Sequence, residues 1–188
     1  KSRKIGESFY MTRRLLGLCL ALLTAVLICT ACNSSPHEPE KPVTTGFACD
    51  VDMTYQDMRI KGRLTRESAG TLQLAFSEPA SLEGMSMQWD GETVTMKMGG
   101  ISFGVDPAAI PQSALGKGLL DALDAGFRSG GDGQVTEKGL ATTGDSVNGQ
   151  FEILSDPESG QLLSMRIPEL NIAASFSNFK TLGESENE

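Results

Sequence analysis

Histidine, the side chain most often used for acid–base chemistry, occurs once in this 188-residue chain. The one histidine, His37, lies in a proline-rich stretch that we expect to be outside the folded part. A Ser-His-Asp or Cys-His arrangement within the fold is therefore excluded. The HExxH metal-site motif, the P-loop and the glycine-rich dinucleotide motif before a helix are also absent from the sequence. We therefore expect a protein that is not an enzyme and that uses no cofactor or metal.

Carboxylates are the remaining candidates for chemistry. Asp50 and Asp52 lie two residues apart on an expected strand and could bind a cation, although a solvated strand face is the simpler interpretation. Asp121 and Asp124 lie on an expected helix, where a solvated face is again the simpler interpretation. The segment 129–133 (SGGDG) follows that helix instead of preceding one, which favours a connecting loop over a phosphate site. Paired-carboxylate hydrolysis stays open, because the sequence does not give the separation of the carboxylates.

Cys32 directly follows a segment with the features of a signal peptide. Two arginines, Arg13 and Arg14, precede an apolar run of fourteen residues from Leu15 to Ile28, and small residues follow directly before Cys32. This order is typical of a secretory signal peptide. The run is shorter than the ~20 apolar residues that span a bilayer, which argues against an uncleaved anchor. We interpret residues 1–10 as an upstream extension.

The segment Ile28-Cys29-Thr30-Ala31-Cys32 resembles the lipobox of bacterial lipoproteins, except that a cysteine stands where leucine or valine is usual. The resemblance implies cleavage after Ala31 and a diacylglyceryl group on Cys32, which would hold the protein on the extracytoplasmic face of a bacterial membrane. A cleaved, soluble secreted protein is the alternative. If Cys32 is lipidated, Cys49 is the one free cysteine of the mature chain, and we expect it to be a buried structural thiol.

Charge excludes nucleic acid as a partner. The chain has a net charge of −8, and removal of residues 1–31 leaves 11 basic and 23 acidic residues, a net charge near −12. Such a charge repels nucleic acid and anionic lipid surfaces. The predicted organisation is a signal segment at 1–31, a lipidated cysteine and proline-rich tether at 32–45, one domain at 46–179 and a polar acidic tail at 180–188.

The domain is expected to be mostly β, with one helix, in the α+β class. Apolar residues alternate with polar ones over many short stretches, and turn signals such as Asp90-Gly91 and Gly99-Gly100 separate them. This pattern is typical of consecutive antiparallel strands with one apolar face. We expect Asp90-Gly91 to form a two-residue hairpin turn. The predicted strands cover 47–55, 72–76, 85–89, 94–98, 101–105, 151–153, 163–167 and 170–176, and allowance for weaker ones gives about ten.

One segment, 111–127, has helical periodicity instead. Its leucines recur every four residues, and Ser113 can cap its start. A helix of this length is ~24 Å long and ~10 Å across, whereas ten strands at ~4.8 Å spacing span ~48 Å. The helix alone cannot cover the sheet. The sheet must therefore curl around the helix, close on itself or leave part of a concave apolar face open.

Methionines are frequent on this expected concave face. Methionine recurs on surfaces that accept varied apolar partners, although it also fills ordinary cores. We predict an apolar cradle in which the helix, as a fixed plug or a movable lid, lies opposite the methionines. The predicted cradle consists of Met53, Met85, Met87, Trp89, Met96, Met98, Phe103, Leu115, Leu119, Leu123 and Phe127.

The segments 68–79 (SAGTLQLAFSEP), 89–94 (WDGETV) and 151–168 (FEILSDPESGQLLSMRIP) resemble the LolA-like superfamily of lipoprotein carriers. The resemblance implies an unclosed half-barrel, a strongly curved antiparallel sheet with helix on its concave side, and a lipid or acyl ligand there. Such carriers usually open with a helix, whereas a strand is expected here at Phe47. Two functions follow as hypotheses: an anchored protein that binds a lipid, acyl chain or lipoprotein, or an envelope interaction protein that uses its acidic surface on a partner protein.

Overall fold

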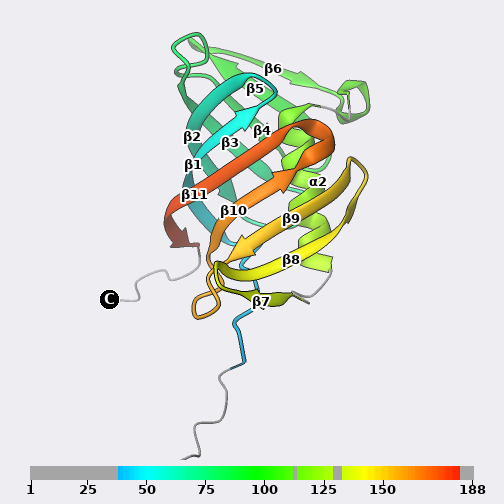
Figure 1. Cartoon of the computed structure of the whole chain (residues 1–188). Coiled ribbons are helices and arrows are strands. Elements are labelled where there is room, and N and C mark those ends of the chain that lie inside the picture. Colours follow the sequence, from blue (N-terminus) through cyan, green and yellow to red (C-terminus); the bar gives the residue numbers. More distant parts are fainter. Residues whose placement is uncertain (1–37, 112–113, 129–132, 183–188) are drawn as a thin grey trace, which may run out of the picture. The chain divides into compact units, whose positions relative to one another are not determined.

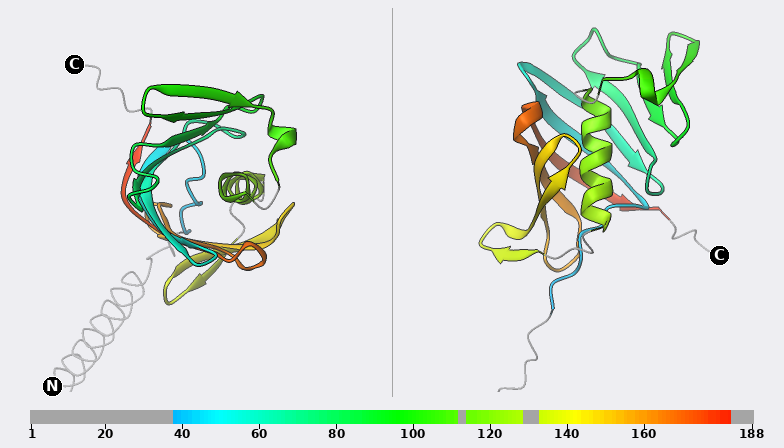
Figure 2. Two further views of the ribbon diagram at one scale, coloured as in Figure 1. Left: turned by 90° about the horizontal axis from the view of Figure 1, so that it is seen from above. Right: turned by 90° about the vertical axis from the view of Figure 1, so that its right-hand side faces the viewer.

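The computed structural model describes residues 38–111, 114–128 and 133–182. In these ranges an antiparallel sheet of eleven strands curves around one α-helix without closing into a barrel (Figures 1 and 2). Sheet and helix belong to the compact unit 39–188. The predicted class, mostly β with a curved open sheet and one helix on its concave side, is confirmed, with eleven strands in place of about ten.

The chain forms two meanders that share one sheet. The strands are β1 (Phe47–Tyr55), β2 (Met58–Arg66), β3 (Leu72–Glu78), β4 (Ser86–Trp89), β5 (Val94–Met98), β6 (Ile101–Val105), β7 (Gln134–Thr136), β8 (Gly139–Ser146), β9 (Gly149–Ser155), β10 (Leu162–Ile167) and β11 (Ile172–Thr181). Their order in the sheet is β6-β5-β4-β3-β2-β1-β11-β10-β9-β8-β7. Pairing of β1 with β11 joins the meanders, so the edge strands are β6 and β7.

This topology places the helix on the concave face. The chain leaves the first meander at one edge of the sheet and must re-enter at the other edge. Helix α2 (Leu115–Arg128) lies in this connection, and the view from above shows it inside the curve of the sheet (Figure 2). Two short 3-10 helices, η1 (Pro107–Ala109) and η2 (Pro168–Leu170), follow β6 and β10. The core lies between the inner face of the sheet and α2.

Two strands with clear inner faces were not predicted. β2 and β8 lack apolar alternation because glycine, threonine and arginine stand at several of their inward positions. Gly62 is required for close approach, since a Cβ there would lie 2.2 Å from the carbonyl oxygen of Ala75. Arg66 is fully buried although it is charged. The short edge strand β7 was also missed.

The turn predicted at Asp90-Gly91 is wrong in length. Trp89 pairs with Val94, so the loop has four residues instead of two. The Asp90 carboxylate accepts the backbone N–H groups of Thr93 at 2.7 Å and Glu92 at 3.0 Å. These bonds lower the pKa of Asp90 and stabilise the wider loop. Gly99 and Gly100, with φ of 55° and 83°, do form a two-residue turn.

Alternation in the predicted strand 163–167 places Leu163 on the inward face with Met165 and Ile167, and for Leu163 this is wrong. The pairing of β10 with β9 shifts register between Leu162 and Ser164. This irregularity moves Leu162 into the core, where it is 2% exposed, and leaves Leu163 38% exposed.

The predicted tether at 32–45 ends earlier than expected. The N–H of Glu40 donates to the Pro157 carbonyl at 2.8 Å, and that of Val43 donates to the Gly160 carbonyl at 2.7 Å. Thr44 is buried. Residues 40–45 therefore pack on the turn between β9 and β10, which alternation could not reveal. At the other end β11 runs to Thr181, two residues beyond the predicted domain end at 179.

Candidate functional site: an apolar ledge on the concave face

The concave face divides into a covered part and an open part. Trp89 and Val94 are 3% and 0% exposed and belong to the core. Side chains that share the face of Val94 lie at every second residue of β5 and at their partners on β6. Along these strands burial falls steadily towards the Gly99-Gly100 turn. The apolar face is therefore continuous with the core, but its side chains become exposed to solvent at the β5–β6 hairpin.

Five apolar residues make up this open part, which we call the apolar ledge. Met87 and Met96 are half-buried and pack against the core. Met98, Ile101 and Phe103 are 48%, 69% and 50% exposed. Cross-strand pairing aligns Met96 with both Met87 and Phe103, and Met98 with Ile101. The ledge is thus a contiguous apolar strip at one rim of the sheet, at the top of Figure 1.

The helix ends the ledge on its inner side because glycines let it lie close to the sheet. A Cβ on Gly116 would lie 1.9 Å from the Trp89 ring, and one on Gly126 would lie 2.8 Å from Ile153. Leu119 and Leu123, on the same helix, are 0% exposed. This close packing makes the covered part of the concave face part of the hydrophobic core.

An ion pair also holds the helix to the sheet. The Arg66 guanidinium on β2 donates to the Asp124 carboxylate on α2, and the Gly70 N–H donates to the same carboxylate oxygen at 3.0 Å. Arg66 Nη1 lies 3.4 Å from the Thr71 carbonyl oxygen. Burial lowers the pKa of Arg66. Its Nε has no hydrogen-bond partner among the described residues. The pair lies outside the ledge and has the geometry of a structural link.

The predicted cradle residues separate into two groups in the structure. Met87, Met96, Met98 and Phe103 come together on the ledge, and Met85 lies half-buried just before β4. A second group is buried in the core, with at most 7% of any residue exposed: Met53, Trp89, Leu115, Leu119 and Leu123. The Phe127 side chain and Cys32 lie outside the described positions. Ile101 was missed as a site residue, although its place three residues after Met98, directly across the Gly99-Gly100 turn, was a usable signal.

The carboxylates considered for chemistry are engaged in ion pairs, those on β1 at the outer face of the sheet and those on α2 with Lys117 and Arg66. Asp50 accepts from Arg63 at 2.7 Å, and Asp52 accepts from Arg59 at 2.6 Å. A hydrogen bond from Asn178, followed by one from Arg63, lowers the pKa of Asp50. Asp121 lies 3.4 Å from Lys117 Nζ. The solvated helix face predicted for Asp121 and Asp124 is wrong, because their side chains are only 15% and 19% exposed. No cluster of three metal-ligating side chains occurs within the described ranges.

Cys49 is buried as predicted, and burial raises the pKa of its thiol to about 12. At neutral pH it is therefore a protonated, unreactive core residue.

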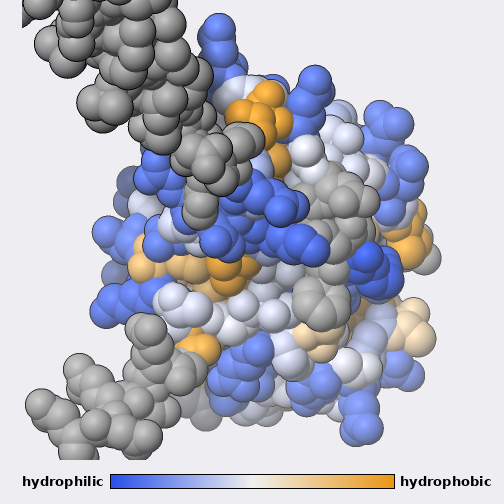
Figure 3. Space-filling model, turned by 90° about the horizontal axis from the view of Figure 1, so that it is seen from below, coloured by the Kyte–Doolittle hydropathy of each residue, from blue (hydrophilic) through white to orange (hydrophobic). Residues whose placement is uncertain are grey.

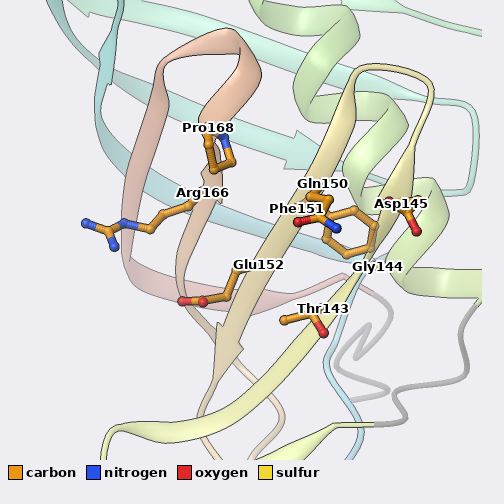
Figure 4. A pocket seen from close by; sticks show the side chains of 8 residues that line it. All are labelled: Thr143, Gly144, Asp145, Gln150, Phe151, Glu152, Arg166 and Pro168. Atoms are coloured by element: carbon orange, nitrogen blue, oxygen red, sulfur yellow. The ribbon is translucent and has the colours of Figure 1, made fainter.

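A hollow on the outer face of β8, β9 and β10 is the second candidate (Figure 4). It measures about 560 Å³ and is lined by Thr143, Gly144, Asp145, Gln150, Phe151, Glu152, Arg166 and Pro168. Glu152 and Arg166 are cross-strand partners, and the Phe151 ring lies against Gly144. Its lining combines hydrophilic and apolar side chains and is mostly hydrophilic. This composition does not indicate a particular class of ligand.

The face at the end away from the β5–β6 hairpin differs from the ledge in its pattern of hydrophobic side chains. The view from below, at the end away from the β5–β6 hairpin, shows small hydrophobic patches separated by hydrophilic side chains (Figure 3). Among the residues that the structure describes, none of the helices is long and apolar enough to cross a membrane.

Comparison with known proteins gives similarity to solved structures only. No family model matches the sequence, and no curated protein matches it. An uncharacterized conserved protein from Thermus thermophilus is 14% identical, with a TM-score of 0.45, over 77% of this chain and 83% of that one. A LolA superfamily protein from Nitrosomonas europaea is 10% identical, with a TM-score of 0.40, over 77% and 89%. A DUF1329 family protein from Desulfovibrio piger is 8% identical, with a TM-score of 0.39, over 77% and 88%.

Proposed function

We propose that this protein is a lipid-anchored protein of the bacterial cell envelope that binds an acyl chain, as part of a lipid or lipoprotein, on its apolar ledge. The observation that carries the proposal is the exposure of Met98, Ile101 and Phe103 on a face that runs directly into the core. Soluble domains rarely expose a contiguous apolar strip unless it contacts a partner.

The chemistry of the ledge suits a flexible apolar chain. Three of its five residues are methionines, whose unbranched, polarizable side chains adapt to apolar groups of varied shape. The strip is open at the rim, so a ligand can enter without displacing α2. Burial of its exposed side chains stabilises a complex by roughly 25 cal/mol per Å² of apolar surface. Nothing on the ledge is charged, which favours the hydrocarbon part of a lipid over its headgroup.

The anchor in this proposal is Cys32, on the strength of the lipobox-like segment 28–32. Attachment to a membrane would place the ledge near a source of acyl chains. The proposal includes no catalytic step. Within the described ranges the cysteine is a buried thiol and the aspartates on β1 are paired with arginines.

Titration with a fluorescent fatty acid tests the ledge directly. We expect saturable binding by the wild-type protein, and an affinity at least tenfold lower for a variant with Ile101→Ser and Met98→Ser. Val147→Ser is a matched control. Val147 lies in the turn between β8 and β9, away from the ledge, and its 67% exposure is close to the 69% of Ile101. Mass spectrometry of protein prepared without detergent should also show co-purified lipid. Absence of probe binding by the wild-type protein would overturn the proposal.

The alternative is an envelope interaction protein that carries no ligand. The close packing of α2, with Leu119 and Leu123 fully buried, favours it, because these side chains occupy the concave face between the helix and the sheet. The fatty-acid titration separates the two. An interaction protein would bind no probe, and substitutions on the ledge would leave the titration unchanged.

A further inference from the structure

The outer edge of β6 presents unpaired backbone groups. In a two-residue hairpin the flanking residues, here Met98 and Ile101, form a hydrogen-bonded pair, and such pairs alternate along the ladder. The N–H and C=O groups of Ile101, Phe103 and Val105 therefore face β5. Those of Ser102 and Gly104 face away from the sheet. None of the described residues beyond β5 donates to or accepts from these two residues.

This edge has none of the usual protection against another strand. Sheet edges are commonly covered, or interrupted by proline or inward-pointing charge. The sequence of β6 is I-S-F-G-V, without charge or proline, and its first four residues are exposed. A Cβ placed on Gly104 would meet nothing within 4 Å. The edge is therefore open to a second strand.

We propose that β6 pairs antiparallel with β6 of a second copy of this chain, about a twofold axis at Phe103. In this register Phe103 faces its own counterpart as a non-hydrogen-bonded pair. Ser102 of each copy lies opposite Gly104 of the other, so their free N–H and C=O groups form four hydrogen bonds between the chains. Ile101 of each copy then lies opposite Val105 of the other. The dimer joins the two sheets edge to edge.

The side chains of β6 are self-complementary in this register. Apolar residues at 101, 103 and 105 share the concave face, and the small Ser102 and Gly104 share the outer face. Rows of apolar side chains would then cross the axis, such as Met96 and Phe103 of one copy followed by Phe103 and Met96 of the other. No charge of β6 meets a like charge, although the whole chain carries a net charge of −8.

A second copy fits this edge better than an unrelated extended peptide. A peptide would use the same backbone groups, but the spacing of apolar and small residues is symmetric about Phe103, which matches the isologous contact of a twofold dimer. The contact is short, so the dimer should be weak and depend on concentration. It needs no lipid and stands independently of the proposed function.

Disulfide trapping tests the register in the full chain. Phe103→Cys should give a disulfide-linked dimer under mild oxidation by oxidised glutathione, because a non-hydrogen-bonded pair has Cα atoms about 4.5 Å apart, within disulfide range. Ile101→Cys is the control. It is more exposed, but its counterpart would lie about four residues, or roughly 13 Å, further along the strand. Dimer trapped equally fast by both variants would overturn the register.

Sedimentation equilibrium tests the association itself. The wild-type mass should rise with concentration from that of one chain towards that of two. Ser102→Pro removes an outward N–H and leaves the ladder with β5 intact, so it should abolish this rise, whereas Ser102→Ala should not. Ser102 lies outside the ledge, and the proline variant should still bind the fatty-acid probe. A wild-type protein that stays monomeric to millimolar concentration would overturn the dimer.

Discussion

A buried charge pair connects the two layers of this domain. Arg66 lies at the end of β2 with no exposed surface, and its partner Asp124 is 58 residues away on α2. The same carboxylate accepts the Gly70 N–H, so a single aspartate holds both the arginine and the loop after it. Desolvation of two charges is costly, and good geometry with added hydrogen bonds is required to offset it. The pair therefore specifies where the helix lies along the sheet.

Breaking the pair should destabilise the protein more than removing it. Asp124→Leu leaves the Arg66 guanidinium buried without a counter-charge, which should lower the free energy of unfolding by about 3–5 kcal/mol. The double variant with Arg66→Met should recover most of that loss, since no buried charge remains. Urea unfolding of the single and double variants measures both. A double variant as unstable as Asp124→Leu would show that the pair acts through packing rather than charge.

At the scale of elements, glycine in α2 has a packing role. Glycine weakens a helix interior by up to ~1 kcal/mol relative to alanine, and α2 contains Gly116, Gly118 and Gly126. All three are buried against the sheet. The loss of helix propensity is offset by a shorter distance between helix and sheet, which lets the Trp89 ring and Ile153 pack directly on the helix backbone. This packing favours the fixed plug over the movable lid.

Alanine should therefore act differently at two of these glycines. Gly116→Ala should lower the melting temperature, because its Cβ would lie 1.9 Å from the rigid Trp89 ring. Gly118→Ala should be milder or even stabilising, since the atom that it meets is the flexible end of Leu170, at 2.4 Å. Thermal melts of the two variants give the ranking. A neutral or stabilising effect of Gly116→Ala would mean that the helix can move away from the sheet, as a lid would.

At the scale of the whole molecule, the predicted anchor at Cys32 can be related to the start of the folded domain. The described chain begins at residue 38 and packs on the sheet from Glu40 onwards, so few residues separate Cys32 from the folded domain. Even fully extended, the eight residues from Cys32 to Pro39 span at most about 29 Å. In the proposed function a lipid on Cys32 would keep the domain close to the membrane.

Replacement of the predicted lipidated residue tests this anchor. Cys32→Ser should prevent acylation, and the protein should then appear in the soluble fraction or remain as an uncleaved precursor. Cys49→Ala is the control, since Cys49 is buried in the core and has no part in anchoring. Membrane fractionation with mass analysis of the product measures the outcome. A mature-size, membrane-bound Cys32→Ser protein would contradict lipidation at this residue.

Sequence alone determined the elements whose faces are chemically uniform. Strict alternation predicted β1, β3, β5 and β6, and a four-residue repeat predicted α2, because solvent and core impose different side-chain periods on strands and helices. The same reasoning missed β2, whose inner face includes Gly62 and Arg66. These residues serve contacts with the Ala75 backbone and with Asp124, which lie far away in the sequence.

Only the tertiary structure decided which part of the apolar face is a site. Met53 and Met98 both lie on inward positions of predicted strands, yet one is 1% and the other 48% exposed. The difference depends on where α2 lies across the sheet, and that position is set by its glycine contacts and by the ion pair between Arg66 and Asp124. Periodicity reports the face of a strand that a residue is on. Whether the helix covers that residue depends on contacts between residues distant in the chain, and the periodicity of a strand carries no information about those contacts.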